Sequence, residues 1–213
     1  MTASGTASSG GRLAPFAGRA PSAFTLAGTL IVASAVVPVA LEPVTDWHWA
    51  AGLLLVGAAV LAVAAGLAGL YPAVRDRAPR LAAVGMAFAG LAAAAASGLI
   101  VLVGSAVVAE SALGVDLQPP SRAFAAVALA MGGGFAVGLA TFGVAGLRTG
   151  TPERGTALLL IAGGALLSGP VAVELLGLAV DGTTPPWVLF PVIGLVAIDV
   201  LAVGLRLRSA EAR

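Results

Sequence analysis

Long uninterrupted apolar segments are the feature that most constrains how this 213-residue chain can fold. Six segments of 19 to 29 residues carry almost no charge, and a helix needs about 20 apolar residues to cross a bilayer. Short breaks rich in Pro, Gly and charged residues separate the segments. The six segments are Ser22–Leu41, Trp49–Tyr71, Leu81–Ala109, Ala123–Leu147, Gly155–Val180 and Trp187–Leu205.

The composition excludes a water-soluble domain, because only 10% of the residues are charged and 59% are hydrophobic, whereas a soluble domain has about 25% charged residues. This excludes an ordinary cytosolic enzyme, a nucleic-acid-binding protein and a disordered chain. Lipid offers no hydrogen-bond partner to the backbone, so spanning segments are helices or strands of a closed barrel. Barrel strands alternate apolar and polar residues, whereas these apolar runs are continuous. We therefore predict an all-α integral membrane protein with six transmembrane helices.

The arginines predict the orientation of these helices. Ten of the eleven Arg residues lie in the N-terminal tail, the breaks at 71–80 and 148–155, and the C-terminal end. The remaining breaks hold Arg122 and five acidic residues. Because positive charge marks cytoplasmic loops, we predict that both termini are cytoplasmic. The expected organisation is a disordered tail at 1–21, a six-helix domain at 22–207 and a short tail at 208–213. Arg without Lys is typical of GC-rich codon usage and indicates a prokaryotic cell membrane.

Three related phrases precede glutamates near the outer ends of the odd-numbered segments. Glu42 follows Pro-Val-Ala-Leu, Glu110 follows Ala-Val-Val-Ala, and Glu174 follows Pro-Val-Ala-Val. The glutamates are separated by 68 and 64 residues, and an Asp comes soon after each. We predict three tandem two-helix hairpins in parallel orientation, with coincidence in an Ala/Val/Leu-rich background as the alternative. Parallel repeats occur in transporters, but they also occur in scaffolds.

Two acidic residues, Glu174 and Asp199, lie inside predicted spans. A carboxylate in the hydrocarbon costs at least about 2.5–3.5 kcal/mol on insertion scales. Each is therefore expected to face the bundle interior, take up a proton or find a hydrogen-bond donor. A proton or cation relay is the functional interpretation, with Glu42 and Glu110 as further candidate binding residues. The structural alternative is a hydrogen bond to a neighbouring helix, with Ser97, Thr141 and Ser168 as candidate partners, or a pairing with Arg206.

Pro38 and Pro170 each precede a glutamate by four residues. A proline inside a helix kinks it and frees the carbonyl four residues earlier. The freed carbonyl and the carboxylate together would suit a hard cation. The alternative is an ordinary kink that neighbouring helices accommodate.

Small residues predict close helix packing. Gly134 and Gly138 form a GxxxG pair, and Gly164 with Ser168 forms a similar one. Small residues at this spacing allow helix backbones to approach closely in a membrane.

The sequence contains no catalytic motif. The chain has no Cys, no Lys and a single His, His48, so thiolate sites and a lysine-containing phosphate loop are excluded. We expect no enzymatic activity, no cofactor and no metal site.

Two functions, which belong to different classes, remain compatible with the sequence. The first is a small permease or ion-coupled carrier in which Asp199 and Glu174 change protonation. The second is a non-catalytic membrane scaffold or accessory subunit that packs through Gly/Ala-rich faces against a partner subunit or against copies of itself. A membrane enzyme or a haem or quinone protein is a further class, for which the sequence shows no motif. The lipid bilayer is the expected partner in every case, and nucleic acid is not.

Overall fold

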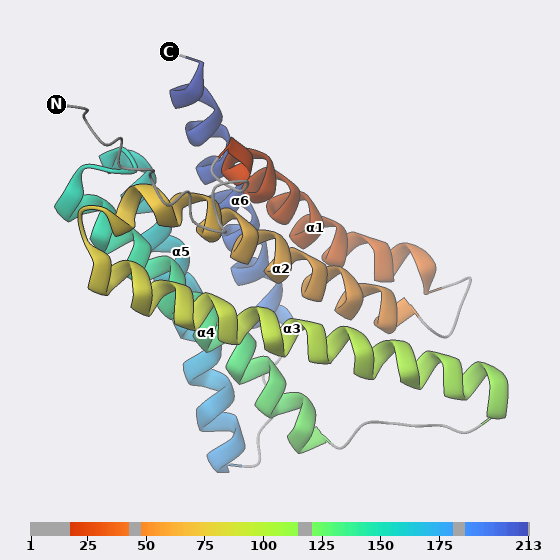
Figure 1. The fold of residues 1–213 in the computed structure, drawn as a ribbon. Coiled ribbons are helices and arrows are strands. Elements are labelled where there is room, and N and C mark those ends of the chain that lie inside the picture. The colour runs from red at the N-terminus through yellow and green to blue at the C-terminus, as the bar shows by residue number, and fades with distance from the viewer. Residues whose placement is uncertain (1–17, 43–47, 115–120, 181–185, 213) are drawn as a thin grey trace, which may run out of the picture.

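The computed structural model describes residues 18–42, 48–114, 121–180 and 186–212. Within these residues the chain forms six α-helices and no β-strand, in agreement with the predicted all-helical class (Figure 1). The helices are α1 (Ala20–Leu41), α2 (His48–Arg75), α3 (Pro79–Leu113), α4 (Ser121–Thr149), α5 (Arg154–Val180) and α6 (Pro186–Glu211).

The helix ends follow local sequence signals. A proline lies in the first turn of α1 and of α3, where its missing N–H removes no helical hydrogen bond. Gly114 ends α3 with a φ of 64°, and Gly150 follows α4 with a φ of 71°. Glycine adopts this left-handed conformation without the penalty that a Cβ imposes. At their polar ends the helices extend beyond the predicted apolar segments, so that α2 continues to Arg75 and α6 continues to Glu211.

Four stretches of the described chain are long and apolar enough to cross a membrane. The described part of α5 that is apolar, Arg154–Gly169, is shorter. Several membrane-capable helices therefore support a multi-pass membrane protein, while the prediction of six spans remains a prediction. The four stretches are Ala20–Leu41, His48–Arg75, Pro79–Ala112 and Ala126–Thr149.

The helices form a closed ring. Each helix packs against its neighbours in sequence, and α1 packs against α6. Helix α2 also contacts α4, so these two helices separate α3 from the space between the other five. The three hairpins of the predicted repeat are all neighbours in this ring, but their mutual equivalence remains a prediction.

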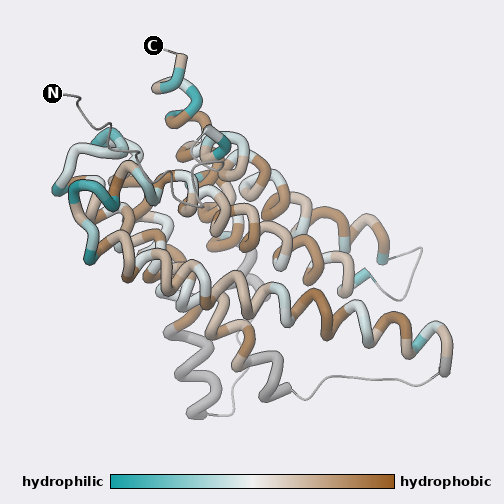
Figure 2. The backbone as a smooth tube through the Cα atoms, in the orientation of Figure 1, coloured by the Kyte–Doolittle hydropathy of each residue, from teal (hydrophilic) through white to brown (hydrophobic). Residues whose placement is uncertain are grey.

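Apolar side chains cover both the interior and the exterior of the bundle. Phe24, Leu67 and Phe142 are fully buried, whereas Val101 and Ile198 are 69% and 66% exposed. Large exposed apolar side chains occur on all six helices, and Figure 2 shows apolar residues along the length of the tube. A soluble monomer rarely exposes such extensive apolar surface, so the exterior fits a lipid environment.

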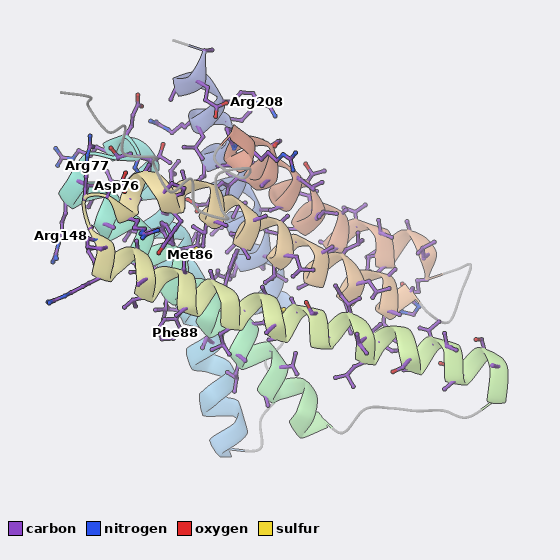
Figure 3. All side chains as sticks on the ribbon, in the orientation of Figure 1. Asp76, Arg77, Met86, Phe88, Arg148 and Arg208 are labelled. Carbon is purple, nitrogen blue, oxygen red and sulfur yellow. The ribbon has the colours of Figure 1, made fainter. Side chains whose placement is uncertain are left out.

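The polar residues gather at one end of the bundle, which we call the Arg-rich end. It contains the α2–α3 turn, the α4–α5 turn and the end of α6 (Figures 2 and 3). The Arg77 side chain donates hydrogen bonds to the Thr149 carbonyl, at 3.1 Å, and to the Thr151 hydroxyl, which ties the two turns together. The described parts of the arginine-rich segments that were predicted to be cytoplasmic thus share one end. The side of a membrane on which this end lies remains a prediction.

Candidate functional site

Asp199 lies in the middle of α6, thirteen residues after Pro186, and is only 7% exposed. Its Oδ2 atom contacts Gly163 of α5, at the place where any other residue would carry a Cβ. The same Oδ2 atom has no hydrogen-bond partner among the described residues. A buried polar atom without a partner costs free energy, so this carboxyl is the polar group in the described core that most needs explanation.

The hydroxyls that were expected to bind Asp199 bind their own helices instead. Ser97 donates to the Ala93 carbonyl at 2.9 Å, and Thr141 donates to the Val137 carbonyl at 2.7 Å. Ser168 donates in the same way to Gly164 at 2.8 Å. Within the described residues, the structure shows no hydrogen bond between Asp199 and any of these three hydroxyls, and its Oδ2 has no partner.

Arg206 is also directed elsewhere. Its guanidinium contacts Gly155, which lies eight residues before Gly163 on α5 and therefore about 12 Å away along the helix axis. Arg206, the arginine nearest to Asp199 in the sequence of α6, therefore does not form an ion pair with an ionised Asp199.

A hollow of about 180 Å³, the central hollow, lies among the five helices other than α3. Its lining is apolar except for Ser34, whose hydroxyl donates to the Ile31 carbonyl at 2.7 Å. Two of its lining residues, Leu167 and Val196, lie one helical turn from Gly163 and Asp199 respectively. The described lining residues are Ile31, Ser34, Val56, Ala59, Val60, Ala128, Met131, Gly132, Phe135, Leu167, Val192, Ile193 and Val196.

A second depression of about 520 Å³, the inner cleft, lies at the Arg-rich end. It is bordered by the starts of α1 and α5, the α4–α5 turn and the ends of α2 and α6. Its lining includes Thr151, Thr156 and the acidic residues Glu153 and Glu211. The inner cleft is therefore more polar than the central hollow.

The interface between α5 and α6, which we call the seam, runs from the central hollow to the inner cleft, and Asp199 lies on it. On α5, Thr156 of the cleft, Leu160, Gly163 and Leu167 of the hollow follow at intervals of four, three and four residues, so they share one helix face. On α6, Val203 lies between Asp199 and the cleft residue Leu207. Leu160 and Val203 are 0% and 1% exposed. They close the seam between Asp199 and the cleft.

Glu42 and Glu110 lie away from Asp199. Glu42 caps α1 and is exposed, and Leu201 of α6 contacts Gly28, fourteen residues before Glu42 and about 20 Å away along α1. Glu110 is half-buried near the end of α3, and α3 does not line the central hollow. The side chain of Glu174 lies outside the described residues.

Pro38 of α1 packs against Gly52 of α2. Its Cγ atom is 2.8 Å from the position that a Cβ on Gly52 would take, and the carbonyl oxygen of Ser34 is 3.4 Å from the same position. The carbonyl freed by the proline therefore faces α2. Among the described residues, no group of three or more acidic, His or Cys side chains is placed to hold a metal ion. The side chain of Pro170 lies outside the described residues.

The small residues singled out in the sequence lie at helix interfaces, with one exception. A Cβ at Gly134 would be 2.8 Å from the Phe88 carbonyl oxygen, and a Cβ at Gly164 would be 2.7 Å from that of Ala136. At Gly138 the nearest atoms are 3.5 Å away, which is ordinary contact. Ser168 is exposed.

Comparison of the chain with protein-family models, curated proteins and solved structures found no match. The candidate site therefore rests on its own geometry. Sequence reasoning identified Asp199 but missed Gly163, Leu160 and Val203. The Gly163–Gly164 pair inside an apolar span was a signal that a neighbouring helix comes close at this level.

Proposed function

We propose that this protein is a small permease or ion-coupled carrier in which Asp199 takes up the coupling proton. One observation carries the proposal: a carboxyl group halfway along a helix is buried, lacks a hydrogen-bond partner at Oδ2 and lies on a seam between two hollows. Membrane-embedded carboxyls are expensive and typically mark ion or substrate pathways.

The position of Asp199 suits alternating access, a mechanism in which one site opens in turn to each side of the membrane. The central hollow begins one turn from Asp199, about 4.5 Å along α6 at Val196, whereas the inner cleft is separated from it by Leu160 and Val203. Asp199 lies between α6, which carries it, and Gly163 of α5. Separation of these two helices would expose Asp199 to the cleft. A carboxyl that is neutral in one state and ionised in the other then couples its proton to this movement.

The direct test is proton movement in vesicles. The purified chain is reconstituted into liposomes that contain a pH-sensitive dye, and gradients of Na⁺, K⁺ and tetramethylammonium are imposed in turn. We expect at least one gradient to drive protons across the wild-type vesicles, and we expect Asp199→Asn to abolish this signal. Asp76→Asn is the matched control, because it makes the same chemical change on an exposed turn. Absence of proton movement in the wild type under all three gradients, or equal movement in Asp199→Asn, would overturn the proposal.

A membrane scaffold is the second candidate, and one surface of α3 favours it. Small exposed residues recur on this helix at alternating intervals of four and three residues, and a Cβ at Gly90 would meet nothing within 4 Å. Such a stripe permits close helix association. The residues of the stripe are Ala83, Ala87, Gly90, Ala94 and Ser97.

The oligomeric state separates the scaffold from the carrier. If copies of the chain associate through α3, Gly90→Leu should convert an oligomer in mild detergent into a monomer, while Leu158→Ala on the exposed face of α5 should leave it unchanged. A monomeric wild-type protein would remove self-association as the function of this stripe.

A further inference from the structure

We infer that the central hollow binds a small apolar molecule that carries a single ammonium group, with Asp199 as the anchor for the charge. This inference rests on the proposed function, because it identifies the substrate class of the same site. The carrier proposal concerns the movement of the coupling ion. The present inference concerns the ligand, whose class we infer from the shape and chemistry of the hollow.

The size and lining of the hollow select an apolar body. An engineered cavity of about 150 Å³ lined by Leu, Ile and Phe takes up benzene, and the central hollow of about 180 Å³ is similar in size. Met131 and Phe135 of α4 face the aliphatic side chains of α1, α2 and α6 across it. The one hydroxyl of the described lining, that of Ser34, already donates to a carbonyl. A ring or short aliphatic group therefore gains burial here without displacing a polar contact.

The charge of Asp199 selects an ammonium rather than a carboxylate. Asp199 is not itself among the lining residues, but it lies one helical turn beyond Val196 on the same face of α6, next to the end of the hollow. Its Oδ2 is packed against Gly163, so the side chain must turn away from Gly163 to reach a ligand there. An ammonium at this end would supply the donor that Oδ2 lacks, in a charge-assisted hydrogen bond. No arginine lines the hollow among the described residues, and Arg206 contacts Gly155 at the level of the cleft. An anionic ligand would meet only repulsion.

Two probes of the same shape test this inference. Benzylammonium carries the charge, and benzyl alcohol replaces it with a neutral group on the same ring. Saturable binding of each probe is measured by equilibrium dialysis with the full chain in lipid nanodiscs at neutral pH. We expect the wild type to bind benzylammonium about 10- to 100-fold more tightly than benzyl alcohol, as a hydrogen bond to a charged group implies.

The substitution Asp199→Asn should remove this preference and leave the weaker binding of benzyl alcohol. Equal binding of the two probes by the wild type would overturn the inference, and so would a preference that survives in Asp199→Asn. Asparagine keeps the shape of the side chain, so the variant also retains the contact with Gly163.

Filling the hollow should weaken the binding of both probes. Ala59→Leu places three further carbons at a lining position that is 2% exposed, and Val56→Phe fills the same space from another position if the first variant does not fold. Ala165→Leu adds the same atoms to an exposed position of α5 and should change neither affinity. Undiminished binding in folded filled variants would place the probes elsewhere and contradict the inference.

The outcomes keep the two proposals distinct. Binding of benzylammonium without proton movement in vesicles would retain this site and remove the carrier. Proton movement that depends on Asp199, without binding of benzylammonium, would retain the carrier and overturn this site.

Discussion

At the scale of single residues, the contact between Asp199 and Gly163 is the feature on which the proposed function depends. The sequence alone identified Asp199, because an acidic residue in the middle of an apolar run is conspicuous. It did not identify Gly163, because the chain has 29 glycines and nothing in their local sequence tells which of them faces a carboxyl 36 positions later. Which residues of two distant helices meet depends on how each helix is rotated about its own axis. Segments that are apolar on all sides specify this rotation poorly.

The substitution Gly163→Ala tests this contact. The added methyl group would occupy the position of Asp199 Oδ2, so the side chain or the helix must shift, and we expect a loss of about 1–3 kcal/mol in unfolding free energy. Proton movement in vesicles should fall as well. Gly90→Ala is the control, because its methyl group meets nothing within 4 Å and should stabilise the helix by about 0.5–1 kcal/mol. Thermal unfolding in detergent measures both, and equal effects would show that Gly163 is not in contact with the carboxyl.

At the scale of helices, the length of the apolar runs predicted the six helical elements well. The predicted segments lie within the observed helices, which are longer because polar residues continue a helix beyond its apolar part. Helix α2 extends to Arg75 at the Arg-rich end, and α3 extends through Glu110 to Leu113 at the other end. The three glutamates that suggested a repeat lie at different distances from the ends of their helices. Glu42 caps α1, Glu110 lies three residues before the end of α3, and Glu174 lies six residues before the end of α5. A shared phrase in sequence thus does not by itself give a shared place in the fold.

The two glycines of the GxxxG pair provide a prediction at this scale. The motif does not distinguish the two glycines, but they differ in their packing. Gly134 lies against the backbone of α3, whereas a Cβ at Gly138 would make only ordinary van der Waals contacts. We expect Gly134→Ala to lower the unfolding free energy by about 1–3 kcal/mol, because the Phe88 carbonyl cannot move aside without shifting α3. Gly138→Ala should be neutral or slightly stabilising, because alanine favours helix. Denaturation of the two variants in the same detergent checks this, and similar losses for both would contradict the observed packing.

At the scale of the whole molecule, the ring of helices creates two spaces that the sequence did not reveal. The central hollow requires side chains from five helices, so it depends on which faces meet and on the contact of α2 with α4. By contrast, the apolar exterior followed directly from composition, because a chain with only 10% charged residues cannot cover most of its surface with polar groups.

Because the chain contains no cysteine, single introduced thiols report cleanly on both spaces. Three variants are informative: Ser34→Cys in the central hollow, Ala73→Cys in the inner cleft, and Ala87→Cys on the exposed face of α3 as a lipid-facing control. Each is placed in oriented vesicles and treated with a membrane-impermeant thiol reagent from one side at a time.

Reactivity of the thiol at position 34 is the measurement that tests the carrier most directly. The account predicts that the reagent modifies Ser34→Cys from the face opposite the Arg-rich end and Ala73→Cys from the face at that end, while Ala87→Cys reacts from neither. A thiol at position 34 that is inert from both faces, in a variant that folds, would mean a dry bundle interior without access from outside, and would contradict the carrier in favour of the scaffold.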